Sequence, residues 1–383
     1  MKNKIIVVAI LLSSLFVLSC KDDETFTLSV TPEKTAASYD GLLMVAHGKN
    51  IYGFAPDSLA VEVELKLNTF ISRPVVDSDG TMYVGDQGTE IGSYGNYLFS
   101  FNKDGSLKNQ ISAIPNISNI VCTNSFVFMD SNCFDGDAYC MGYAIVDKAT
   151  ETRTQLNTDL TYYLTHSGSQ WIYNNKIYVG TAYRSGKGNT NVYPISFFTI
   201  NATTGEKSDA MSDFTVASGN QEKFFYTLDG GTLITLYGNQ YVFRKYNLDT
   251  NELEATLSVA GDVPALQTGL DSMTAEDVSS GLYRYQITSP VVCGRKLYAF
   301  CVNTAYSKDA GCPSFQCIIV IDLDTFTFEK YVSLERTGVY DLASPFYTAD
   351  AEPNSVYFIH ENNFEKYSLA DGTCTASTAV SVD

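Results

Sequence analysis

The sequence predicts an all-β fold, a seven-bladed β-propeller built from four-stranded blades. Three observations lead to this prediction. A unit of four short strands recurs along the chain. The chain has 26 Tyr and 22 Phe but a single Trp, and this aromatic content favours strands. No stretch of helix length shows convincing helical periodicity, and Leu266–Val278 is expected to hold one short helical turn and no more.

The repeat is clearest in "RPVVDSDGTMYVGD", which is followed by "NYLFSFNKDGSLKNQI". Each piece is predicted to form a strand, a tight or polar turn, and a second strand. The steps between the ends of the predicted third strands are 45–54 residues, apart from one step of 75. This is the blade spacing of a propeller, and insertions before Tyr193 and from about Val259 to Tyr283 explain the longer steps. Six or eight blades are the alternatives. The residues that end the seven third strands are Phe54, Phe101, Val146, Ile200, Tyr246, Ile321 and Tyr367.

The first copy, "LLMVAHG" with "NIYGFAPDSLAVEVEL", has no clear innermost strand. A lone four-stranded sheet cannot bury both of its faces, whereas seven sheets around an axis bury each face against a neighbour. We therefore expect the two ends of the chain to share one blade, with "TFTLSV" as the contributor. The predicted organisation is a propeller over residues 37–383, preceded by a tether and possible ring-closing strand over 20–36.

The N-terminus carries an export signal. Lys2 and Lys4 precede an apolar run from Ile5 to Leu18, which is followed by Ser19 and Cys20. A basic start, an apolar run and a small residue are typical of a secretory signal peptide, here residues 1–19. The run is shorter than the roughly 20 apolar residues that a membrane span needs.

The stretch "LFVLSCKDDE" resembles a bacterial lipoprotein signal, which implies lipidation of Cys20. The tetrad Lys21–Glu24 resembles the acidic export signal that directs lipoproteins of Bacteroidota to the outer cell surface. These resemblances imply a chain that is lipid-anchored in the outer membrane and faces the cell exterior. The alternative for the cysteine is a soluble secreted protein in which Cys20 is incidental. The alternative for the tetrad is a plain solvated linker.

The composition restricts the partners. The formal net charge is −18, which argues against nucleic acid and against direct binding to an anionic membrane. Contact with the membrane is therefore expected through the lipid anchor only. Eight cysteines follow Cys20, and an even number in an exported protein permits disulfides. The pairs closest in sequence are the candidates, namely Cys133 with Cys140 and Cys312 with Cys317.

Binding residues are expected on one face of the disc. Second-to-third strand loops and blade-to-blade connections lie together on this face, which we call the loop face, and they carry nearly all the excess sequence. The opposite turn face has tight turns such as Asp79–Gly80, Asn174–Asn175 and Gly230–Gly231. Long loops on a rigid scaffold are where binding usually resides, and Tyr and Arg are favoured at binding hot spots. The candidates in the loops are Tyr94, Tyr139, Tyr183, Arg184, Lys187, Tyr193 and Tyr306. Arg73 and Trp171 are candidates because they begin inner strands and are expected to point into the central funnel. His47, His166 and His360 lie near the same face, and ring closure is expected to make His47 and His360 neighbours.

No metal, cofactor or catalytic residue is predicted. The histidines show no HxH or HxxxH spacing that would bring two ligands together. "SDGT" at Ser78–Thr81 half-matches the Asp-box of sialidases but does not repeat. A glycan-cleaving enzyme would need paired carboxylates about 5–9.5 Å apart. The acids on suitable loops are Asp86, Glu90, Asp135, Asp137 and Asp309.

The export signal, the seven copies and the aromatic loops together resemble a group of surface lipoprotein propellers of Bacteroidota. These work beside TonB-dependent outer-membrane transporters and capture ferric siderophores or corrinoids. The resemblance covers the architecture of the whole chain but has specific motifs only at Leu15–Glu24, so no site residue is transferred from it. It implies a non-enzymatic protein that captures a nutrient and delivers it to such a transporter. A glycan-binding or glycan-cleaving propeller and a protein-interaction or adhesion module are the alternatives.

Overall fold

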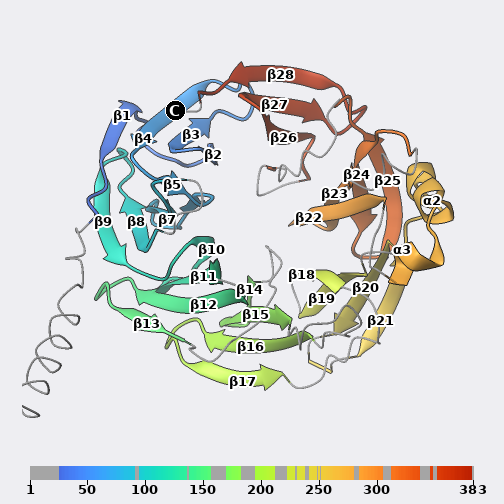
Figure 1. The fold of residues 1–383 in the computed structure, drawn as a ribbon, viewed down its shortest axis with the longest axis horizontal. Coiled ribbons are helices and arrows are strands. Elements are labelled where there is room, and N and C mark those ends of the chain that lie inside the picture. The colour runs from blue at the N-terminus through green and yellow to red at the C-terminus, as the bar shows by residue number, and fades with distance from the viewer. Residues whose placement is uncertain are drawn as a thin grey trace, which may run out of the picture.

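The structure of the chain is a computed structural model. It describes residues 26–90, 95–135, 138–156, 170–182, 195–211, 222–228, 231–237, 241–247, 249–250, 252–279, 284–304, 312–336, 346–347 and 352–381. Across these residues the strands form seven antiparallel sheets arranged in a ring (Figure 1). The prediction of a seven-bladed β-propeller is confirmed.

The first four blades follow one another along the chain. Blade 1 contains β1 (Val30–Lys34), β2 (Leu43–His47), β3 (Asn50–Phe54) and β4 (Val61–Leu67). Blade 2 contains β5 (Phe70–Ile71), β6 (Val75–Val76), β7 (Met82–Gly88), β8 (Tyr97–Phe101) and β9 (Leu107–Ser112). Blade 3 contains β10 (Ile117–Cys122), β11 (Phe126–Asp135), β12 (Ala138–Asp147) and β13 (Arg153–Gln155). Blade 4 contains β14 (Gln170–Tyr173), β15 (Lys176–Ala182), β16 (Ile195–Asn201) and β17 (Lys207–Met211).

The last three blades complete the ring. Blade 5 contains β18 (Glu222–Leu228), β19 (Thr232–Tyr237), β20 (Val242–Asn247) and β21 (Leu253–Ser258). Blade 6 contains β22 (Tyr285–Cys293), β23 (Lys296–Asn303), β24 (Gln316–Asp322) and β25 (Thr327–Ser333). Blade 7 contains β26 (Ser355–His360), β27 (Asn363–Ser368) and β28 (Cys374–Ala379). All seven residues that mark the sequence period lie in equivalent strands, each followed along the chain by one last strand of its repeat: β3, β8, β12, β16, β20, β24 and β27.

The expected ring-closing strand lies elsewhere. The N-terminal β1 pairs with β4 at the outer edge of blade 1, so the strand order there is β1-β4-β3-β2. The prediction that the two ends of the chain share one blade is therefore wrong. In the described residues blade 1 has no strand inside β2, and blades 1 and 7 are separate sheets.

Side chains join blades 1 and 7 instead. The rings of Phe54 and Phe364 are fully buried and stack with their centroids 4.1 Å apart. The Tyr52 hydroxyl donates to the backbone oxygen of Ser381 over 3.0 Å. The Tyr357 hydroxyl donates to the backbone oxygen of Pro56, also over 3.0 Å. Packing between the first and last blades therefore takes the place of a shared sheet.

The hydrophobic core is divided into layers between neighbouring blades. Alternate residues of each strand point to opposite faces of its sheet, so each blade contributes one apolar set to each neighbour. Buried clusters accordingly span blades 1 and 2, 2 and 3, 3 and 4, 5 and 6, 6 and 7, and 7 and 1. The largest fully buried side chains are aromatic, among them Phe99, Phe101, Phe128, Tyr143, Tyr241, Phe243, Phe300 and Phe358.

A repeated capped turn joins the third and fourth strands. The side-chain oxygen of Asp147 accepts the backbone N–H groups of the residues two and three positions later, over 2.9 and 2.8 Å. Asn201, Asn247 and Asp322 occupy the same place in "NATT", "NLDT" and "DLDT". Such Asx turns fix the chain reversal locally. The backbone and side-chain hydrogen bonds from Thr150 hold the pKa of Asp147 below its usual value.

Gly372 brings blades 6 and 7 into close backbone contact. It has φ +78°, and a Cβ there would lie 1.8 Å from the backbone oxygen of Ser333. The N–H of Glu335 donates to the carbonyl of Gly372 over 3.0 Å. Only glycine satisfies both the dihedral angle and the contact.

Replacement of Gly372 by alanine is expected to lower the unfolding free energy by at least about 2 kcal/mol, from the left-handed backbone and the forced shift together. Gly41 has φ +74°, but a Cβ at that position would meet no atom within 4 Å, so Gly41→Ala should cost only about 1 kcal/mol. Urea unfolding of the two variants measures the difference. Equal losses would show that the contact with Ser333 contributes nothing.

The insertion after blade 5 is more helical than expected. It forms α2 (Pro264–Asp271) and α3 (Ala275–Ser279), where the sequence predicts one turn. Tertiary packing explains the difference, because Leu266 is fully buried in the layer between blades 5 and 6. Gly269 lies so close to Tyr285 that a Cβ would be 2.7 Å from the ring. Neither described helix is long and apolar enough to cross a membrane.

Candidate binding site

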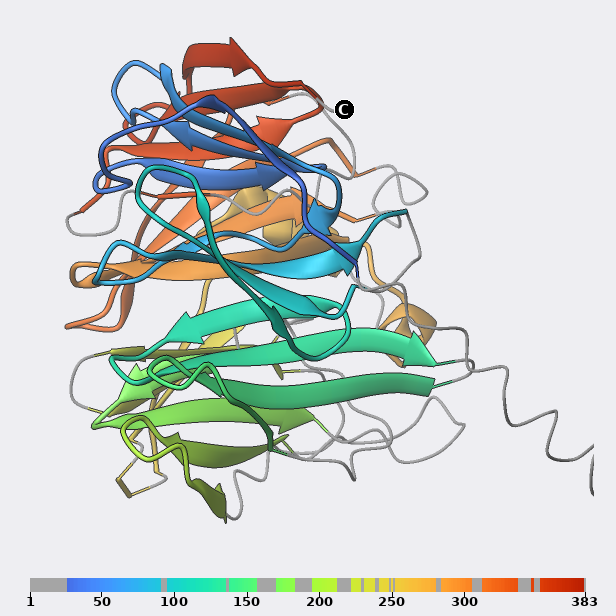
Figure 2. The same ribbon diagram turned by 90° about the vertical axis from the view of Figure 1, so that its left-hand side faces the viewer.

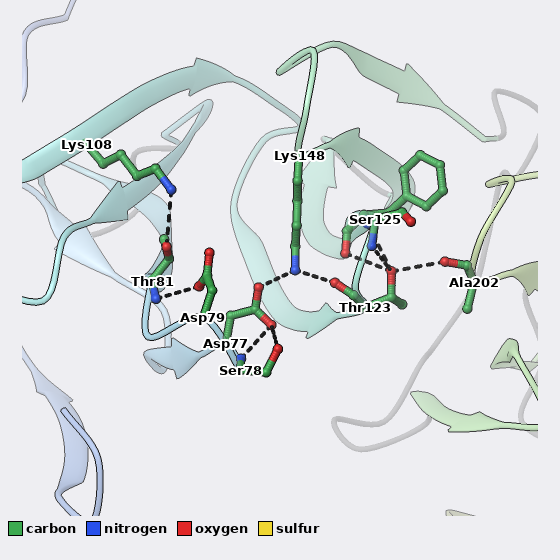
Figure 3. A network of polar contacts seen from close by, with 10 residues as sticks. Asp77, Ser78, Asp79, Thr81, Lys108, Thr123, Ser125, Lys148 and Ala202 are labelled. Carbon is green, nitrogen blue, oxygen red and sulfur yellow. Dashed lines mark hydrogen bonds and ion pairs between the residues drawn. The ribbon is translucent and has the colours of Figure 1, made fainter. Parts of the chain in front are cut away.

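On the turn face, turns of neighbouring blades contact one another. Lys148, in the turn after β12, forms an ion pair with Asp77 of blade 2 and donates to the backbone oxygen of Thr123 (Figure 3). The two charged side chains are only 14% and 8% exposed. The Thr123 hydroxyl donates to the backbone oxygen of Ala202 in blade 4 over 3.1 Å. This network links blades 2, 3 and 4, so its charges stabilise the disc and are not available to a ligand.

The inner strand of blade 2 is interrupted at Arg73. β5 and β6 both pair with β7 but are separated by residues 72–74. Pro74 has no N–H to continue the ladder. The Ser72 hydroxyl accepts the N–H of Gly85 over 2.8 Å and so replaces part of the missing pairing. Arg73 is exposed between these two buried neighbours.

Arg73 reaches across blade 1 to blade 7. Its guanidinium carbon lies 4.5 Å from the centroid of the Phe346 ring, and Phe346 pairs with Tyr357 on the inner side of β26. A guanidinium over an aromatic face is an attractive cation–π arrangement. Blade 1 lies between blades 2 and 7 in the ring (Figure 1), so the contact is made where blade 1 lacks an innermost strand.

The inner edge of β2 is open among the described residues. His47 and Asn50 pair across a two-residue turn, so residues 43, 45 and 47 bond to β3 and the backbone groups of Met44 and Ala46 point the other way. We call this open edge, together with Arg73 and Phe346, the blade 1 gap. Phe346 is not predicted as a site residue, because it belongs to blade 7 and the sequence does not show that it lies beside Arg73 of blade 2.

Two of the three histidines lie at the loop-face end of this region. His47 ends β2 and His360 ends β26. Their expected proximity is supported by a side-chain hydrogen bond between His47 and Asn362, in the turn that follows His360. Partial burial lowers the pKa of His47, and this hydrogen bond offsets part of the effect. The Nε2 atom of His47 is buried and has no hydrogen-bond partner in the described part of the chain.

The side chains of two charged residues, Asp86 and Arg284, are held by contacts within the fold. Asp86 is 3% exposed and accepts the Thr69 hydroxyl over 2.6 Å and the N–H of Gly88 over 3.0 Å. It therefore organises the base of the loop after β7. Arg284 is also buried, and it pairs with Asp277 of α3 over 2.8 Å. No group of three potential metal-ligating residues occurs within the described ranges.

Most of the other predicted site residues lie outside the described residues. These are Tyr94, His166, Tyr183, Arg184, Lys187, Tyr193 and Tyr306, as well as Cys20, Asp137 and Asp309. For Asp135, Tyr139 and Trp171 the backbone is described within β11, β12 and β14, but the side chains are not. Glu90 is exposed at the start of the loop after β7. Their roles remain predictions.

The cysteine prediction needs one correction. Cys312 and Cys317 are not bonded to each other. Cys317 is fully buried in β24 directly opposite Cys301 of β23, while the Cys312 sulfur lies 3.6 Å from the Ser272 hydroxyl. The strand therefore directs Cys317 into the core, away from the loop. Cys133 and Cys140 are direct partners in the β11–β12 register, but their side chains are outside the described part of the chain, so that disulfide stays a prediction.

No protein-family model matches the chain, and no curated protein matches its sequence. Solved structures do match. A functionally unknown protein from Desulfotomaculum acetoxidans is 10% identical with a TM-score of 0.55, over 88% of this chain and 95% of the other. Kluyveromyces lactis Hsv2 is 11% identical with a TM-score of 0.51, over 92% and 100%. The likeness shows the fold.

Proteins named as enzymes also occur among the matches. Kuenenia stuttgartiensis hydrazine synthase is 10% identical with a TM-score of 0.48, over 79% of this chain and 77% of the other. At such identities the comparisons leave open whether the chain catalyses a reaction.

Proposed function

We propose that the chain is a lipid-anchored binding protein of the bacterial surface. It captures a nutrient of the ferric siderophore or corrinoid class on its loop face and delivers it to a TonB-dependent outer-membrane transporter. The signal around Cys20 supports the location. The observation that carries the binding role is the blade 1 gap, where the exposed Arg73 lies over Phe346 on a rigid disc.

The charges favour one of the two nutrient classes. A ferric catecholate siderophore is anionic and would need several cationic donors, but Arg284 is paired with Asp277 and the net charge of the chain is −18. A corrinoid offers a broad face of low net charge, which suits a single guanidinium beside an aromatic ring and an open strand edge. We therefore place the corrinoid class first.

Size-exclusion chromatography tests the proposal, because both ligand classes are coloured. The mature protein is mixed with cobalamin or with a ferric siderophore and separated from free ligand. Co-elution of the ligand colour with the protein is the expected result for at least one class. If neither class co-elutes, while a glycan or a protein does, nutrient capture is wrong.

Replacement of Arg73 by alanine should weaken binding of the retained ligand by about 30-fold, the effect typical of a hot-spot residue. Arg73→Lys keeps the charge but loses the planar stacking group, so its affinity should lie between those of the unaltered protein and Arg73→Ala. Isothermal titration calorimetry measures the affinities. Lys103→Ala, on the turn face of blade 2, is the matched control and should bind like the unaltered protein. Equal affinity of Arg73→Ala and this control would remove the blade 1 gap from the site.

A protein-interaction role is the second candidate, and the open edge of β2 favours it. The backbone groups of Met44 and Ala46 on the inner edge of β2 have no strand partner in the described residues, and they could pair with an extended peptide, as in β-strand addition. Such binding would depend on the backbone and would change little in Arg73→Ala. The Arg73 variants therefore distinguish the two candidates.

A further inference from the structure

The N-terminal segment reaches the disc from its loop-face side. β1 is antiparallel to β4, with Val30 opposite Leu67 and Lys34 opposite Glu64. Leu67 is at the loop-face end of β4, because its N–H bonds to Lys49 in the β2–β3 turn. The chain that precedes Val30 therefore continues toward the loop face.

Two amide side chains hold that preceding segment. Asn68, just after β4, donates to the backbone oxygen of Thr27 over 3.1 Å and accepts the N–H of Ser29 over 3.0 Å. Gln110 of blade 2 donates to the backbone oxygen of Phe26 over 2.6 Å and accepts the N–H of Leu28 over 3.1 Å. Each amide thus satisfies two backbone groups, and the segment is fixed across blades 1 and 2.

The first described residue is held as well. The ring of Phe26 stacks on Tyr97 with a centroid distance of 5.8 Å. Tyr97 begins β8, immediately after the loop-face connection from β7. The entry point of the chain is therefore at the rim of the loop face, beside blades 1 and 2. Figure 2 shows the disc from its side, with the dark-blue strand β1 running along its outer surface.

The tether between the lipid site and this entry point is short. Five residues separate Cys20 from Phe26, and six extended steps span at most about 20 Å. A lipid on Cys20 would hold the rim of blades 1 and 2 within that distance of the bilayer. We propose that the docked segment and the short tether together turn the loop face toward the lipid surface. This orientation rests on the anchoring half of the proposed function.

The orientation has a consequence for delivery. A ligand held on the loop face would lie between the disc and the membrane, on the side where an outer-membrane transporter is embedded. The disc would not need to turn over before transfer. A long flexible tether would allow either face to approach the bilayer and would give no such direction.

Energy transfer to the membrane tests the orientation. The full lipidated protein, reconstituted in phosphatidylcholine vesicles that contain an acceptor-labelled lipid, carries a fluorescent amino acid in place of Thr89 or of Lys103. Both positions are exposed in blade 2, Thr89 on the loop face and Lys103 on the turn face. Strands of five to seven residues make the disc about 20 Å thick, so transfer from position 89 should be at least about twofold more efficient. Equal transfer, or stronger transfer from position 103, would overturn the proposal.

Two controls separate the causes. Insertion of twenty Gly and Ser residues between Glu24 and Thr25 adds a flexible span of about 25 Å and should remove the difference between the two positions. If the difference in transfer between the two positions persists, the short tether does not cause it. Mass spectrometry of the purified protein reports the lipid on Cys20. Absence of lipid on Cys20 would overturn both the anchor and the orientation. Nutrient capture is measured with the mature chain without lipid, so its outcome does not depend on the anchor.

Discussion

The Phe364→Ala variant is expected to lose about 3–5 kcal/mol of unfolding free energy, the usual cost of removing a buried aromatic ring from a core. Phe364 is fully buried and stacks on Phe54 at 4.1 Å. It also has Tyr357 and Phe346 around it, with centroids 6.0 Å away in each case. The loss should be large because this cluster joins the first and last blades, which share no strand in the described residues.

Urea unfolding followed by circular dichroism measures the loss. Leu253→Ala is the control, because Leu253 is 50% exposed at the outer edge of blade 5, and it should cost less than about 1 kcal/mol. The Phe54→Ala/Phe364→Ala double variant should lose less than the sum of its two single variants, since the residues are in contact. A loss for Phe364→Ala as small as the control would show that another element closes the ring.

The Lys148→Met variant is expected to lose about 3–5 kcal/mol, because it leaves the Asp77 carboxylate without its charge partner in a largely buried site. The ion pair lies between blades 2 and 3, with side chains 14% and 8% exposed. The substitution also removes the donor to the backbone oxygen of Thr123. The same urea titration measures the effect.

An exposed ion pair provides the matched comparison. Arg295 and Asp324 pair on the surface of blade 6 with side chains 56% and 53% exposed, so Arg295→Ala should cost less than about 1 kcal/mol. The Asp77→Asn/Lys148→Met double variant should recover part of the loss, because no uncompensated charge remains buried. Similar losses for Lys148→Met and Arg295→Ala would contradict a stabilising role for the buried network.

The repeat made the fold predictable, and its irregularities limited the prediction. The seven marker residues fall in equivalent strands because the repeat puts an apolar or aromatic residue at that position of every blade. The missing innermost strand of blade 1 could also be anticipated, since "LLMVAHG" has no strand before it. The pairing of the N-terminal strand could not be anticipated. "TFTLSV" has the alternation of any half-buried strand, yet the strand that forms, β1, shares only Val30 with it. Only the outer edge of β4, with Asn68 and Gln110 nearby, decides its place.

The site was predictable in part for a similar reason. Arg73 was predicted because it begins an inner strand, and the structure shows it exposed with its guanidinium over the Phe346 ring. Its partner Phe346 comes from blade 7, and sequence alone does not show that the two side chains meet. Asp86 lies near the loop face, where a ligand-binding carboxylate would be expected. Its hydrogen bonds with Thr69 and Gly88 show that it stabilises the fold instead. Sequence gives the position of such a group but not its hydrogen bonds.

Hydrogen–deuterium exchange with and without the retained ligand tests most directly the claim that the disc binds a nutrient at the blade 1 gap. Ligand should slow exchange in peptides that contain β2, residues 70–76 and Phe346. Peptides from the turn face, such as those with Asp77–Thr81 and Asp147–Glu151, should exchange at unchanged rates. Protection confined to the turn face, or a bound ligand that leaves β2 and residues 70–76 unprotected, would contradict the account.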